Sequence, residues 1–193
     1  MENTLIKELL SAVVKNPEEV AEKLLLTFGS LGGIAEAECE EIRDVLLGDI
    51  STALYIKLAV SLASRRECDK LILGKKHTAE EIENYLTAFF FGASVETVAV
   101  VSLDIQGRVV AADKAGEGTV NFSNVMPRKI LEIAKKRKAK SVIIAHNHPG
   151  GYPTPSDDDV VSSKMLSEML CVSGINLSAS YVIAGNKCIL IDT

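Results

Sequence analysis

The hydrophobic period of this chain changes along its length, from helical spacing to a mixture of strand and helix patterns. Over residues 1–66 apolar side chains recur every three or four positions, which predicts a small helical bundle with Leu54, Leu58 and Leu62 on one helix face. From residue 95 onward, β-branched apolar runs alternate with further helical segments. Some expected strands are joined by tight turns and others by helices, so the pattern predicts a mixed β-sheet flanked by helices.

A change in composition divides the chain. Residues 67–77 are rich in charge and glycine, and we interpret them as a linker. Thr78 and Glu81 then form a capping box, in which hydroxyl and carboxylate each satisfy a backbone amide at a helix start. The expected fold class is therefore α/β (α+β), with a helical domain over 1–66 and a sheet domain over 78–193.

The boundaries of the elements follow from turn and capping residues. We expect helices over 2–14, 18–28, 40–47, 51–66, 78–91, 129–138 and 156–172. We expect strands over 96–103, 108–112, 118–122, 141–145, 177–184 and 187–191.

Composition restricts the class of protein. Hydrophobic residues make up 47% of the 193, enough for a packed core, and the formal net charge is −5. An acidic balance argues against a broad nucleic-acid-binding surface, which needs clustered lysine and arginine. One basic run follows Pro127, and we interpret it as a solvated helix face in preference to a binding patch. Its members are Arg128, Lys129, Lys135, Lys136, Arg137, Lys138 and Lys140.

The four cysteines are scattered without CxxC spacing, so they predict neither a cysteine-based metal site nor a compact disulfide framework. The sequence begins without the basic and apolar regions of a secretory signal. No apolar run approaches the ~20 residues needed to span a bilayer. We therefore expect a cytoplasmic protein with reduced thiols and no membrane segment.

The chemistry of the chain is concentrated in residues 146–159. His146 and His148 follow an apolar strand at a spacing that points both imidazoles to the same side. A turn rich in glycine and proline then leads to Asp159. Two histidines and a carboxylate, with one position left for water, are the ligand set of a catalytic zinc (Zn²⁺) site. The metal would lower the pKa of that water toward ~7 and so allow attack on a carbonyl.

Two further residues are candidates for roles in catalysis. Glu96, at the start of the first long strand, is the best candidate for the general base that carries a proton to the leaving amine. Ser156 precedes Asp159 by three positions, and its hydroxyl is placed to stabilise a developing oxyanion. Each residue also has a simpler interpretation: Glu96 as a solvated strand end, Ser156 as a helix N-cap, and the histidines as part of a rigid surface turn.

The spacing of His146-x-His148, seven residues, then Ser156-x-x-Asp159 resembles the JAMM/MPN+ metalloprotease motif at every position. The extended form of the loop, from His146 through Pro149 and Pro155 to Asp159, is similar to the RadC branch of that superfamily. The likeness continues at Glu96 to Asp104, Gly118 to Asn121 and Pro127-Arg128, and in the helical half at Ala21 to Leu25 and Phe28 to Leu31.

The resemblance implies a JAMM/MPN-like domain with zinc on His146, His148 and Asp159, with Glu96 as general acid and base and Ser156 assisting. It also implies a helix-hairpin-helix element in the N-terminal half. Where that element usually has Gly-x-Gly to contact DNA phosphate, this chain has Gly48-Asp49-Ile50, which counts against DNA binding.

A second departure is Ser180-Tyr181, where the family commonly has Asp-His; it changes the surroundings of the site but removes no expected metal ligand.

Three functional hypotheses follow. The leading one is a zinc metallopeptidase or isopeptidase that acts on a peptide or an isopeptide-linked protein. The second is a DNA-repair-associated binding module in which the metal is structural. The third is a metal-dependent hydrolase of another bond, such as a phosphodiester. The sequence leaves the natural substrate and the oligomeric state open.

Overall fold

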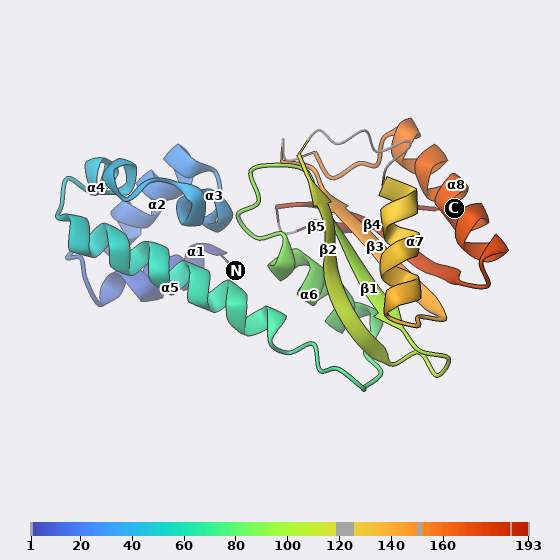
Figure 1. Cartoon of the computed structure of the whole chain (residues 1–193). Helices are drawn as coiled ribbons and strands as arrows, with labels where there is room; N and C mark the ends of the chain where they lie inside the picture. The colour runs from blue at the N-terminus through green and yellow to red at the C-terminus, as the bar shows by residue number, and fades with distance from the viewer. Residues whose placement is uncertain (1, 119–125, 150–151, 186, 193) are drawn as a thin grey trace. The chain divides into compact units, whose positions relative to one another are not determined.

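The computed structural model of the chain describes residues 2–118, 126–149, 152–185 and 187–192 (Figure 1). The chain divides into two compact units, Met1–Arg66 and Glu67–Thr193. We describe each unit by itself.

The first unit is a group of five helices. They are α1 (Glu2–Ser11), α2 (Pro17–Phe28), α3 (Leu31–Glu36), α4 (Cys39–Leu46) and α5 (Ile50–Cys68), the last of which runs two residues into the second unit. Their apolar faces are buried together, and the fully buried side chains include Ile6, Leu10, Leu24, Ile34, Ile42 and Ile56.

The leucines of α5 lie on one face, as expected, but that face is exposed. Leu54, Leu58 and Leu62 retain 57%, 56% and 59% of their accessible surface. The buried face carries Ala53, Ile56 and Val60 instead. Both faces have helical spacing, so spacing alone does not decide which face is buried.

Short-range capping explains most helix ends in this unit. Gly29 ends α2 with a left-handed φ of 76°, as its position after Phe28 predicted. α4 ends one residue earlier than expected, at Leu46, because Leu47 rather than Gly48 adopts the left-handed conformation. The helix α3, which is short and contains two glycines, was not predicted; its N-cap Ser30 accepts a hydrogen bond from Gly33 N (3.1 Å).

The second unit is built on a five-stranded sheet in the order β2-β1-β3-β4-β5. The strands are β1 (Thr97–Leu103), β2 (Val109–Glu117), β3 (Ser141–Asn147), β4 (Asn176–Ala184) and β5 (Lys187–Leu190). β3 pairs antiparallel with β1 and parallel with β4, and the other two pairs are antiparallel. The predicted mixed sheet is therefore confirmed.

Helices cover both faces of the sheet. α6 (Ala79–Phe89) packs on one face, and α7 (Met126–Lys136) and α8 (Asp157–Val172) pack on the other (Figure 1). Successive residues of β1 alternate between the two cores: Ala99 and Val101 face α6, whereas Val98 and Val100 face α7 and α8. Every residue of β1 is buried.

Several boundaries differ from those predicted. β2 continues five residues beyond Ala112, and β3 continues through Asn147. α6 begins after the Thr78 capping box, as predicted, where Thr78 N donates to Glu81 Oε2 (2.8 Å) and Glu81 N donates to Thr78 Oγ1 (3.2 Å). The strand expected over 118–122 lies almost wholly outside the described residues.

Within the described part of the chain, no single helix is long and apolar enough to cross a membrane. Cys39–Leu46 and Ile50–Leu62 reach that threshold only when they are taken together, as a pair bent by 115°.

Candidate metal centre

The two histidines are positioned by the central strand of the sheet. His146 is paired with Val98 of β1 and follows Val142 and Ile144 on the face that packs against α7 and α8. His148 lies one residue past β3, where its backbone N–H donates to the Ile183 carbonyl of β4 (2.8 Å). This bond continues the pairing with β4, so both imidazoles leave the strand on the same side.

Asp159 is positioned by the first turn of α8. Ser156 is the N-cap: its Oγ accepts from Asp159 N (3.2 Å), while Asp159 Oδ2 accepts from Ser156 N (2.8 Å) and from Ser156 Oγ (2.6 Å). This is a capping box with aspartate in the third helical position. The box fixes the carboxylate and leaves its second oxygen, Oδ1, directed at His146.

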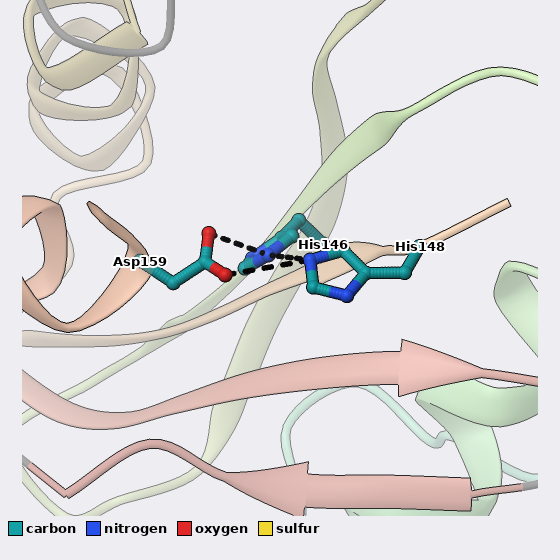
Figure 2. Close-up of side chains that lie close together, drawn as sticks. All are labelled: His146, His148 and Asp159. Atoms are coloured by element: carbon teal, nitrogen blue, oxygen red, sulfur yellow. Dashed lines mark hydrogen bonds and ion pairs between the residues drawn. The ribbon is translucent and has the colours of Figure 1, made fainter. Parts of the chain in front are cut away.

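The three side chains converge at one point (Figure 2). His146 Nε2 lies 3.1 Å from His148 Nε2 and 3.1 Å from Asp159 Oδ1, and His148 Nε2 lies 3.4 Å from Asp159 Oδ2. His146 and Asp159 are largely buried, with side-chain exposures of 5% and 12%, whereas His148 retains 23%. Among the described residues, this is a group of three ligand-type side chains able to hold one metal ion.

The ring of His148 is oriented by the hydrogen bond of its other nitrogen, Nδ1. His148 Nδ1 lies 2.8 Å from the backbone carbonyl of Tyr152. A carbonyl only accepts hydrogen bonds, so Nδ1 donates to it, and Nε2 is the ring nitrogen that faces Asp159 and His146. A backbone carbonyl behind a ligating imidazole is a common way to fix this tautomer in metal sites.

Asp159 is ionised at neutral pH. Burial on its own raises the pKa of this carboxyl, but hydrogen bonds from His146, the Ser156 hydroxyl and the Ser156 amide outweigh burial and hold the pKa well below its usual range. The centre therefore combines a carboxylate with the Nε2 atoms of two imidazoles.

This donor set fits a small divalent cation. At tetrahedral zinc, bonds of about 2.0–2.2 Å place neighbouring donor atoms roughly 3.3 Å apart. The observed separations of 3.1, 3.1 and 3.4 Å lie on either side of that value. Imidazole nitrogen and carboxylate oxygen are both ligands that zinc prefers in proteins.

Glu96 lies immediately before β1. It precedes Val98 by two residues, so the alternation of the strand places it on the face of His146. Its carbonyl accepts a hydrogen bond from Gly118 N (2.8 Å). Glu96 is half-buried.

A cavity adjoins the triad between the sheet and helices α7 and α8. His146 and Asp159 line it together with Ile144, Leu166, Ser163 and Ser180. The Ser163 hydroxyl is buried and has no hydrogen-bond partner among the described residues. The pattern of the sequence did not indicate Ser163, because a serine inside a helix has no distinctive spacing.

The fold and the centre define a class: a mixed α/β domain that carries a candidate metal-binding triad at the end of a central strand. Within that class, the chain belongs to the RadC family, since the RadC-like JAB domain matches residues 76–191. This confirms the resemblance inferred from the loop and its spacing.

Similar proteins match most of the chain. The UPF0758 proteins of Chromobacterium violaceum and Desulforudis audaxviator are each 31% identical over 173 residues, which cover 88% of this chain and 76% and 74% of those proteins. The UPF0758 protein HEAR2468 of Herminiimonas arsenicoxydans is 28% identical over 176 residues, covering 90% of this chain and 78% of that protein. Alignments of this length include the helical unit as well as the sheet.

Proposed function

We propose that the chain is a zinc-dependent hydrolase of amide bonds, acting on a peptide or on an isopeptide-linked protein. The observation that carries the proposal is the convergence of His146, His148 and Asp159, whose facing nitrogen and oxygen atoms lie 3.1–3.4 Å apart. Membership of a JAB domain family is consistent with a hydrolase.

The three side chains would hold zinc through one nitrogen of each histidine and a carboxylate oxygen. Zinc bound there would supply a Lewis acid that lowers the pKa of a water molecule toward ~7. The chain supplies the orientation: the Tyr152 carbonyl fixes the ring of His148 and Ser156 fixes the carboxylate of Asp159. The adjoining cavity, with Ile144 and Leu166 in its wall, gives the centre an apolar side.

Glu96 would act as the general base and then as the general acid. Its carboxylate takes a proton from the attacking water as the new C–O bond forms at the amide carbon. It then gives that proton to the nitrogen as the C–N bond breaks, so the amine leaves neutral. The position of Glu96 on the His146 face supports this assignment.

Ser156 has a more restricted role in this proposal. Its hydroxyl proton is already donated to Asp159 Oδ2 (2.6 Å). To stabilise an oxyanion directly, Ser156 would have to release that bond. Its support of Asp159 is therefore the better-founded contribution, with the oxyanion role as a second assignment.

The helical unit supports no DNA contact through the turn before α5. Asp49 Oδ1 accepts from Thr52 N (2.9 Å), so a carboxylate already occupies the first turn of this helix. A phosphate approaching the same amides would meet a negative charge. We therefore place a protein or peptide, rather than DNA, as the partner of this chain.

The first test is metal content. We expect zinc near one per chain in the wild type and its loss in His146→Ala/His148→Ala, measured by elemental analysis of untagged protein. Wild-type protein that stays metal-free after zinc is supplied would overturn the assignment of the centre.

The second test is hydrolysis of peptide libraries and isopeptide-linked protein, with products identified by mass spectrometry. Glu96→Gln should keep zinc and lose hydrolysis by about 10²–10⁴-fold, the usual contribution of a general base. Glu132→Gln makes the same chemical change at an exposed site of α7 and should have no effect. A Glu96→Gln protein as active as wild type refutes the role of Glu96.

A further inference from the structure

Asn147, between the two histidines, has hydrogen bonds to the backbone on both sides of Glu96. Its Oδ1 accepts from Thr97 N (2.7 Å), and its Nδ2 donates to the carbonyls of Val95 (3.1 Å) and Ala93 (3.2 Å). The residue is only 4% exposed. The orientation of the amide is unambiguous, since an N–H faces the oxygen and two carbonyls face the nitrogen.

These bonds lie where β1 and β3 stop pairing. The last pair is Val98 with His146, and one further step would place Thr97 opposite Asn147. At this position Thr97 N donates to the side chain of Asn147. The backbone N–H of His148, which follows Asn147 at the end of β3, donates to β4 instead. An amide side chain therefore bridges the two strands at the edge of the metal centre.

We propose that Asn147 is the residue that positions Glu96 for proton transfer. His146 and His148 flank Asn147 in sequence, so one short segment carries two metal ligands and the anchor of the base. The distance between the base and the metal ligands is then set by one buried and two partly buried hydrogen bonds. This inference rests on the proposed function, because positioning matters only if Glu96 transfers a proton.

The chemistry of the anchor requires asparagine. Aspartate has nearly the same shape and can accept from Thr97 N, but it cannot donate to the carbonyls of Val95 and Ala93. Its charge would also lie against two carbonyl oxygens. Leucine would leave the buried Thr97 N–H and two partly buried carbonyls without these partners, which carries a larger penalty and a risk of misfolding.

The experiment compares Asn147→Asp with Asn176→Asp, which makes the same change at the exposed start of β4. We expect Asn147→Asp to keep zinc and to lose about 100-fold in kcat, the cost of a displacement near 1 Å in a catalytic group. Amide exchange over residues 93–98 should accelerate. Asn176→Asp should change none of these quantities.

The double variant with Glu96→Gln separates positioning from a general structural effect. If Asn147 acts through Glu96, Asn147→Asp should reduce activity little further once the carboxylate is gone. Losses that multiply fully in the double variant would overturn the proposal, as would wild-type kcat in Asn147→Asp.

A wild-type protein that holds zinc and hydrolyses nothing would overturn the proposed function instead. Amide exchange over 93–98 would then still report on the anchor: unchanged exchange in Asn147→Asp refutes it.

Discussion

Asp159 performs two tasks with two oxygens, and a substitution by glutamate should separate them. Oδ2 closes the capping box of α8 with Ser156, whereas Oδ1 lies 3.1 Å from His146 Nε2 in the candidate metal centre. Glutamate is the usual partner of serine in a capping box. Asp159→Glu should therefore preserve the start of the helix while moving the carboxylate away from its ligand position.

The expected magnitudes follow from the geometry. One added methylene displaces the carboxylate by about 1.5 Å, against a tolerance of about 0.2 Å in metal–ligand distances. We expect at least a 100-fold weaker zinc affinity, which corresponds to about 2.7 kcal/mol. In the metal-free protein, Asp159→Ala should lower the free energy of unfolding by about 1 kcal/mol through loss of the cap, and Asp159→Glu should leave it unchanged.

Two assays are needed. Zinc affinity is measured by competition with a chromophoric chelator, and stability by urea unfolding of the metal-free proteins. Zinc binding in Asp159→Glu that matches wild type would show that this carboxylate is not a ligand at the observed geometry. Equal stability of the alanine and glutamate variants would show that the capping box contributes nothing.

Three other predictions concern the rest of the chain. Ser102 is fully buried and its hydroxyl has no hydrogen-bond partner among the described residues. Ser102→Ala should therefore raise the free energy of unfolding by about 1 kcal/mol, measured with urea; a loss of stability would reveal a partner. Burial, followed by the charge of Glu83, raises the pKa of the Cys188 thiol to about 12, so it should stay protonated and resist alkylation up to pH 9, whereas the exposed Cys171 reacts. Mass mapping of native alkylation checks this, and early labelling of Cys188 would contradict it. Ile56→Ala should cost about 3 kcal/mol, while Leu58→Ala, on the exposed face of the same helix, should cost under about 0.5 kcal/mol; equal losses would mean that the Leu58 face is covered.

The elements that the sequence predicted best depend on neighbouring residues. The capping box at Thr78 and the start of α8 after Ser156 involve residues three positions apart, and the structure confirms both helix starts. The exposed face of α5 could not be predicted in this way. Spacing shows that Leu54 and Leu58 share a face, but which face is buried depends on the other helices of the bundle.

The same distinction applies to the metal centre. His146, His148 and Asp159 lie within one strand, turn and helix, so their convergence could be predicted from spacing alone. The environment of Glu96 depends on bonds to Asn147, about fifty positions further along the chain. No local pattern encodes such a contact, because it arises from the order of strands in the sheet.

The complete burial of β1 has a consequence for the register of the sheet. A strand with one solvent-exposed face is held in register by its hydrophobic pattern, because a shift of one residue would expose its apolar side chains to water. β1 is buried on both faces, so the same shift would exchange one buried residue for another and turn Glu96 away from His146. Alignment must then come from polar contacts at its ends, including the turn where Asp104 Oδ1 accepts from Gln106 N and Arg108 N. A substitution in that turn, roughly 27 Å from Glu96 along the strand at about 3.4 Å per residue, could therefore reduce activity without contacting the site.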